Sequence, residues 1–127
     1  MVFILLLSIP AVAADRVKIG DLYYNISAAT GEAEVTYEKY QTYDNYRNLK
    51  SVHIPAMIEV GGKRYKVTSI GNYAFYRAGN IELLSIDFGL NKIGTFAFNE
   101  CNLLNHKTAN GLRNRDPESL KLGPVLS

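Results

Sequence analysis

The chain has 127 residues, enough for one domain or for a piece of a larger protein. With 47% hydrophobic and 20% charged residues, its composition is typical of a folded globular chain and excludes general disorder. The net charge of +2 comes from interspersed acids and bases, so the sequence lacks the basic patch that binds nucleic acids or anionic membranes.

Residues 1–14, MVFILLLSIPAVAA, carry no charged side chain and end in small residues. This pattern predicts a secretory signal peptide cleaved after Ala13 or Ala14, although no Lys or Arg precedes the apolar run. The alternative is a buried N-terminal strand. A bilayer-spanning helix needs about 20 apolar residues. We therefore expect a secreted or cell-surface protein with no membrane span in the mature chain.

Strand-like alternation begins with LYYNIS (22–27) and AEVTYEKY (33–40), joined by a loop that contains Gly31. After SVHIP (51–55), a second hairpin is predicted from MIEV (57–60) and RYKVTSI (64–70). Gly61 and Gly62 lie between them, and glycine adopts positive φ without a Cβ clash. We interpret residues 15–66 as a β-hairpin capping segment that includes the first repeat strand.

Four tyrosines, Tyr37, Tyr40, Tyr43 and Tyr46, are spaced three residues apart. Neither α nor β geometry places that spacing on one face. An irregular edge between strand and loop is the favoured interpretation, and a row of rings that stacks on sugars is the alternative.

A 23-residue repeat follows, because SIGNYAFYRA (69–78) recurs as KIGTFAFNEC (92–101). Val52 and Ile54 correspond to Leu84 and Ile86 at an offset of 32, which a nine-residue insertion at the Gly61–Gly62 hairpin explains. The predicted repeat core is Val52, Ile54, Val67, Ile70, Gly71, Ala74, Phe75, Ile81, Leu84, Ile86, Leu90, Ile93, Gly94, Ala97, Phe98, Cys101 and Leu104.

The repeat positions have physical reasons. Leu84 and Ile86 share one face of a strand because they are two residues apart. Gly94 is expected to adopt a backbone conformation closed to residues with a Cβ, and Phe98 to fill the space behind the sheet. One coil cannot cover its own apolar face, so the pattern predicts stacked coils that form a solenoid with parallel strands.

These residues resemble the BspA-type leucine-rich repeats of surface and secreted proteins of anaerobic bacteria and some protists. The family unit reads C-x-x-L-x-x-V-x-I-P-x-x-V-x-x-I-G-x-x-A-F-x-x-C. This chain has AGNIELLSIDFGLNKIGTFAFNEC, with Ala78 in place of the first Cys and Asp87 in place of the Pro. The resemblance covers about Asp21 to Leu104. It implies a mainly β leucine-rich-repeat solenoid of about two coils over residues 67–104, and extracellular protein binding or adhesion without catalysis.

The pattern ends after Leu104, where it calls for apolar residues at 107 and 109 and finds Lys107 and Ala109. We expect residues 105–127 to be a non-repeat tail, either a capping element or the result of a truncation or frameshift near codon 105. A truncated fragment without its own function is thus an alternative. Translation of the other two reading frames would distinguish the two. An open solenoid end also predicts self-association.

The sequence carries no metal or catalytic signature. His53, His106 and Cys101 do not make a metal-ligand set, and one cysteine excludes an internal disulfide. No nucleophile elbow or phosphate-binding loop is present, so no cofactor is expected. Cys101 is interpreted as a buried, inert thiol.

Function is therefore assigned to the surface. The side chains that alternate with the strand core are predicted to form an outward sheet face that binds an extracellular or host protein. A carbohydrate-binding module using the tyrosines is the other alternative. The predicted binding residues are Ser51, His53, Leu83, Ser85 and Asp87, with Pro55 beside them.

Overall fold

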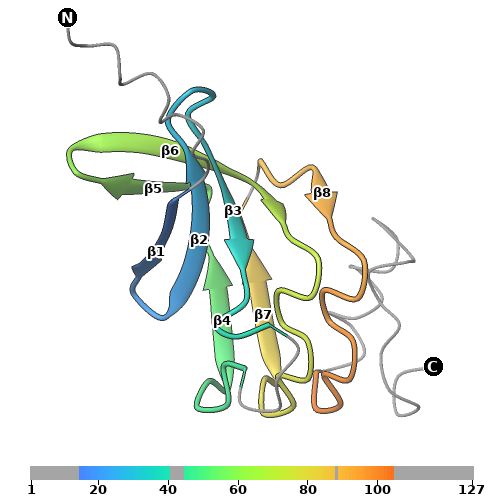
Figure 1. Ribbon diagram of the computed structural model, residues 1–127. Helices are drawn as coiled ribbons and strands as arrows, with labels where there is room; N and C mark the ends of the chain where they lie inside the picture. The colour runs from blue at the N-terminus through green and yellow to red at the C-terminus, as the bar shows by residue number, and fades with distance from the viewer. Residues whose placement is uncertain (1–14, 41–44, 88, 105–127) are drawn as a thin grey trace, which may run out of the picture.

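The computed structural model describes residues 15–40, 45–87 and 89–104 (Figure 1). These residues form strands joined by turns, with no helix among them, so the predicted mainly β fold is confirmed. The strands are β1 (Asp15–Ile19), β2 (Leu22–Ser27), β3 (Glu32–Thr36), β4 (Ser51–Ile54), β5 (Met57–Val60), β6 (Lys63–Ile70), β7 (Leu83–Ile86) and β8 (Lys92–Ile93).

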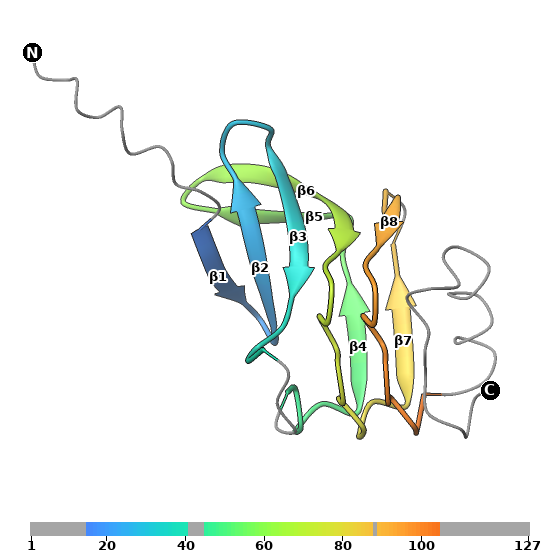
Figure 2. The same cartoon turned by 45° about the vertical axis from the view of Figure 1, so that its right-hand side comes forward.

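The strands form two sheets. In the larger one the order is β1-β2-β3-β6-β5, and β8 pairs in parallel with the end of β6. The smaller sheet is the parallel pair β4–β7, which lie side by side in Figure 2. β6 runs without a break through the boundary we placed between residues 66 and 67, so the capping segment and the repeats share one strand.

Both predicted hairpins occur at their glycines. Gly61 and Gly62 have φ of 58° and 81° between β5 and β6, and Gly31 has φ of 72° between β2 and β3. The sequence analysis missed β1, which pairs with β2 at the edge of the sheet. β1 reads DRVKI, and charged side chains are common on edge strands because they discourage pairing with other chains.

Two turn segments follow the repeat strands: residues 71–81 after β6 and 94–104 after β8. Hydrogen bonds of 3.0–3.3 Å within each segment close successive tight turns, from Ala74 N–H to the Gly71 carbonyl and from Ala97 N–H to the Gly94 carbonyl among others. Three backbone bonds join the segments, from the N–H groups of Tyr73, Phe75 and Arg77 to the carbonyls of Thr95, Ala97 and Asn99, at 3.1, 2.7 and 2.8 Å.

The apolar side chains of the two segments also stack. The Phe75 and Phe98 rings are nearly parallel, with centroids 5.1 Å apart and 9° between their planes, and both are fully buried. On the other side of Phe75, Tyr46 lies 5.0 Å away and continues the row. The stacking predicted from the 23-residue repeat is therefore present, and residues before the repeat extend it.

The predicted repeat-core residues lie in the interior. Three of them are only partly buried: Leu84 and Ile86 on β7, the last strand of the smaller sheet, and Leu90 near the end of the stack. The other predicted core positions are buried.

The expected reason for Gly94 was wrong, because neither Gly94 nor Gly71 has positive φ. Gly94 is required for close packing instead: a Cβ there would lie 2.4 Å from Asn72 Oδ1 and 2.7 Å from the Gly71 carbonyl carbon. The positive φ values of the turn segments fall on Tyr73, Arg77, Phe96 and Glu100, at 58–61°.

Asn45 closes the N-terminal end of the stack. Its Nδ2 group donates to the carbonyls of Ala74 and Tyr76 at 3.1 and 3.3 Å. Its Oδ1 accepts the N–H groups of Glu38 and Lys39 at 2.8 and 3.3 Å. One fully buried side chain thus donates to two carbonyls of the first turn segment, as the backbone N–H groups of the first segment donate to carbonyls of the second.

Candidate functional site

The predicted binding residues come together on the outer face of the β4–β7 sheet. The parallel register places Ser51 beside Leu83 and His53 beside Ser85. Asp87 follows β7 directly. All five side chains are exposed, because they alternate with the buried Val52 and Ile54 and the partly buried Leu84 and Ile86.

Three of these side chains form a polar cluster that the sequence did not predict. His53 Nδ1 lies 2.9 Å from Ser85 Oγ, and His53 Nε2 lies 3.3 Å from Asp87 Oδ2. A neutral imidazole that accepts the serine proton at Nδ1 and donates from Nε2–H to the carboxylate satisfies both contacts. The cluster fixes the orientation of His53 in the middle of the face.

The same three residue types make up hydrolytic triads, but this arrangement lacks the surroundings that such chemistry uses. The His53 and Asp87 side chains are 59% and 49% exposed, so water screens their interaction. Hydrolytic triads also lie in an enclosed site in which N–H donors point at the developing oxyanion. Ser85 lies instead within a strand that is paired with β4, on an exposed face. The cluster is better suited to hydrogen bonding with a partner than to acyl transfer.

An apolar groove of about 610 Å³ adjoins this face beside β4. Met57, one of the most exposed apolar side chains, lies in it. The sequence analysis missed the groove because its walls come from three separate hairpin and strand segments. Its lining includes Ile19, Leu22, Leu49, Val52, Pro55 and Met57.

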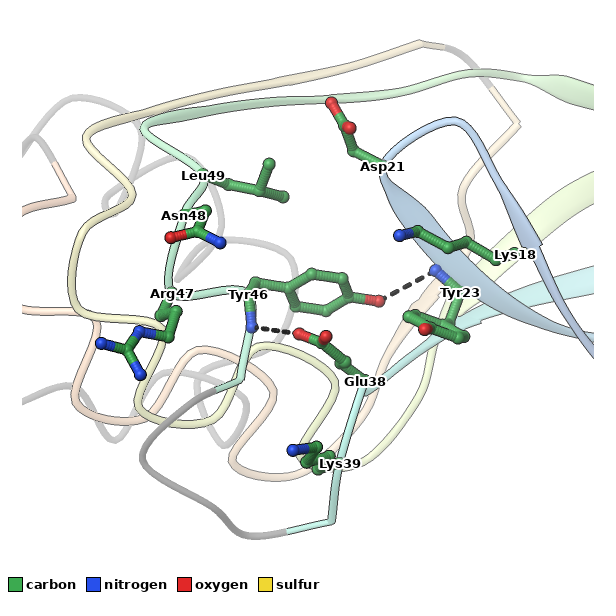
Figure 3. Close-up of a pocket in the computed structure, with 9 residues that line it drawn as sticks. All are labelled: Lys18, Asp21, Tyr23, Glu38, Lys39, Tyr46, Arg47, Asn48 and Leu49. Carbon is green, nitrogen blue, oxygen red and sulfur yellow. Dashed lines mark hydrogen bonds between the residues drawn. The ribbon is translucent and has the colours of Figure 1, made fainter.

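A second hollow, of about 360 Å³, lies where Tyr46 meets the start of β2 and the residues that follow β3 (Figure 3). The Tyr46 hydroxyl accepts the Tyr23 N–H at 2.9 Å and donates to the Thr36 carbonyl at 2.5 Å, while the Tyr46 N–H donates to Glu38 Oε1 at 3.0 Å. Burial raises the pKa of the Tyr46 hydroxyl well above its usual range. These contacts join β2 and β3 to the stack. The polar groups of Tyr46 and Glu38 in this hollow therefore have a structural role.

The four evenly spaced tyrosines do not form one row. Tyr46 is buried in the core, Tyr40 is exposed and Tyr37 is partly buried, while Tyr43 is outside the described residues. Tyr40 contacts Tyr37 and also Tyr73, whose ring centroid lies 5.6 Å away. The sequence spacing could not show this, because the partner ring comes from the repeat.

Cys101 is fully buried beside Phe75, whose carbonyl accepts its Sγ–H at 3.0 Å. Burial raises the pKa of the thiol to about 12.

Among residues 15–40, 45–87 and 89–104, no group of three His, Cys, Asp or Glu side chains could hold a metal ion. His106 lies outside the described part of the chain. In that part no helix is long and apolar enough to cross a membrane.

The stacked turn segments and the parallel strand pair define a solenoid-type repeat protein. The model of the BspA type leucine rich repeat region matches residues 39–121, which is well over half of the chain. The chain therefore belongs to the BspA-type leucine-rich repeat family. The match extends past Leu104, where our interpretation of the sequence ended the repeats.

Solved structures of three bacterial proteins are similar. A leucine rich cell surface protein from Faecalibacterium prausnitzii is 24% identical with a TM-score of 0.58, over 75% of this chain and 23% of that one. A leucine-rich repeat protein from Bacteroides ovatus is 28% identical with a TM-score of 0.59, over 70% and 22%. One from Bacteroides capillosus is 20% identical with a TM-score of 0.50, over 71% and 78%.

This chain thus spans less than a quarter of the first two proteins. No curated protein matches it in sequence.

Proposed function

We propose that this chain is an exported, non-catalytic repeat protein that binds another protein through the outer face of the β4–β7 sheet. The observation that carries the proposal is the arrangement of that face. Leu83 is 57% exposed and lies next to the hydrogen-bonded cluster of His53, Ser85 and Asp87. An exposed apolar side chain with fixed polar groups around it is the composition of a protein-binding surface.

Both parts of this face favour recognition. Burial of the Leu83 side chain against a partner would stabilise the complex by about 25 cal/mol per Å² of apolar surface removed from water. The polar cluster is already oriented within the protein, so less side-chain entropy is lost when a partner binds. The adjoining groove beside Met57 and Pro55 offers space for an apolar side chain of the partner.

Two further observations support export. Residues 1–14 have the apolar run and small-residue ending of a signal peptide. One solved protein of similar fold is described as a leucine rich cell surface protein. A surface location would place the β4–β7 face in contact with extracellular proteins, and binding there needs no cofactor.

The test is to probe an array of extracellular proteins with the chain from residue 15 onward. Leu83→Asp and His53→Ala should each abolish binding to a partner found this way. Leu103→Asp is the matched control, because Leu103 is 54% exposed but lies outside both strands. Equal binding by all three variants would refute the assignment of the face, as would the absence of any partner. Export is tested separately by locating the expressed full chain in cell fractions.

A further inference from the structure

A third hollow, of about 360 Å³, lies over the junction of β3, β6 and β8. It is separate from the β4–β7 face and shares no residue with it. Side chains from the capping segment and from both repeats meet there. Those that carry chemistry are Glu34, Tyr37, Tyr40, Asn72, Tyr73 and Lys92.

Three tyrosine rings form one wall of this hollow. Tyr37 and Tyr40 have centroids 5.3 Å apart and planes tilted by 53°, and Tyr40 meets Tyr73 at 5.6 Å and 76°. Rings at such angles make an uneven wall rather than one closed stack, with Tyr40 exposed and Tyr37 and Tyr73 partly buried. The stacking of repeats explains why Tyr73 lies over Phe96, at 5.5 Å. It does not explain why Tyr40, with 56% of its surface exposed, extends that row into solvent.

Polar side chains also line the hollow. Glu34 Oε1 accepts the Asn25 amide at 3.1 Å, and Asn72 Oδ1 accepts the Thr95 N–H at 2.8 Å. These bonds hold the two side chains in place. In the part of the chain that the structure describes, Glu34 Oε2 and the Asn72 Nδ2 group have no hydrogen-bond partner, so both are available to a ligand. Lys92 adds an exposed ammonium group, with no ion pair among the described residues.

The floor is backbone, because Gly71 and Gly94 lie beneath these groups. A Cβ on Gly71 would lie 2.8 Å from the Glu34 carboxyl carbon. The carboxylate can therefore lie directly on the backbone, and the space above it stays open. One carboxylate and one ammonium group line the hollow, so the site does not favour a ligand with net charge.

We propose that this hollow binds a neutral pyranose unit of a glycan. A pyranose ring has an apolar C–H face, which packs on tyrosine rings through their negative π surfaces. Its hydroxyl groups both donate and accept hydrogen bonds. They would donate to the Glu34 carboxylate and accept from the Asn72 amide and the Lys92 ammonium. The site is independent of the proposed protein-binding face, and Tyr46, which is buried, takes no part in it.

The test uses the chain from residue 15 onward on an array of neutral glucans, mannans and galactans, with acidic polysaccharides included for comparison. A neutral oligosaccharide that binds is then titrated in solution. Tyr40→Ala and Glu34→Gln should each weaken its affinity by about tenfold or more, equivalent to about 1.4 kcal/mol. Tyr40→Phe should retain binding, because it keeps the ring.

Leu83→Asp, on the other face, should leave sugar affinity unchanged, which separates this proposal from the protein-binding one. Circular dichroism melting confirms that Tyr40→Ala folds, as expected for an exposed ring. The proposal is overturned if no neutral glycan binds, if acidic glycans bind better, or if folded Tyr40→Ala binds as well as the unaltered chain.

Discussion

Asn45 offers the sharpest test of how the capping segment holds the repeats. The change Asn45→Ala removes all four side-chain hydrogen bonds while leaving the backbone intact. It leaves the Ala74 and Tyr76 carbonyls without their donor and the Glu38 and Lys39 N–H groups without their acceptor.

The expected loss follows from these distances and from burial. The bond to Ala74 is buried, so water cannot easily replace it, and a buried polar group left unpaired costs about 1–3 kcal/mol. The other three bonds are partly buried, and two of them are 3.3 Å long, so each contributes less. The free energy of unfolding should fall by about 2–4 kcal/mol in total.

Urea denaturation followed by circular dichroism measures this loss. Asn45→Asp keeps the acceptor but replaces the donor with a carboxylate that faces two carbonyl oxygens, so it should be at least as destabilising at neutral pH. Asn80→Ala is the control. Asn80 is exposed, and its side chain makes one hydrogen bond to the described residues, to the Arg47 carbonyl at 2.6 Å, so its loss should cost less than about 1 kcal/mol. A loss below about 1 kcal/mol for Asn45→Ala would refute the capping role.

Phe98→Ala should lower the free energy of unfolding by about 3–5 kcal/mol, because the ring is fully buried. Phe96→Ala should lower it by less, because that ring is only partly buried. Equal losses of the two variants in urea denaturation would contradict the stacked core. Burial raises the pKa of Cys101 from 9.0 to about 12, so the folded protein keeps a proton that the unfolded chain releases. Stability from this group is therefore complete below pH 9 and is lost as the pH rises toward 12. Near pH 10.5 the thiol should lower the free energy of unfolding by up to about 2 kcal/mol. Cys101→Ala, which copies Ala78 of the preceding turn segment, should remove this part of the decline and leave the part that comes from the buried tyrosines Tyr24 and Tyr46. The same decline in both proteins would show that the thiol is not a cause. Sedimentation of the chain from residue 15 onward should show oligomers, since β7 and β8 each pair on one side only among the described residues, and a single compact monomer would disagree.

The sequence was sufficient to predict the features that its repeat determines. Ala74–Phe75 and Ala97–Phe98 recur at a fixed spacing, so the stacking of one Phe on the other could be expected before any coordinates. The same reasoning placed His53 and Ser85 on one outward face, because alternate residues of a strand point to the same side. It did not show that they are hydrogen-bonded, since that depends on the register of β4 against β7.

Features that depend on contacts outside the repeat period could not be predicted. Asn45 bonds to carbonyls 29 and 31 residues away, and neither separation matches the repeat. Tyr40 lines the hollow over the junction of β3, β6 and β8 together with Tyr73, which only the fold brings to it. Gly94 was expected to matter for its φ angle, but close packing against another segment requires it, and a single sequence does not distinguish these reasons.

The central claim is that successive repeat turns lie on one another. Nuclear Overhauser measurements on protein with labelled phenylalanine test it most directly. With ring centroids 5.1 Å apart, Phe75 and Phe98 should give strong cross-peaks between their ring protons. Well-resolved signals from both rings without any cross-peak between them would contradict the stacked arrangement.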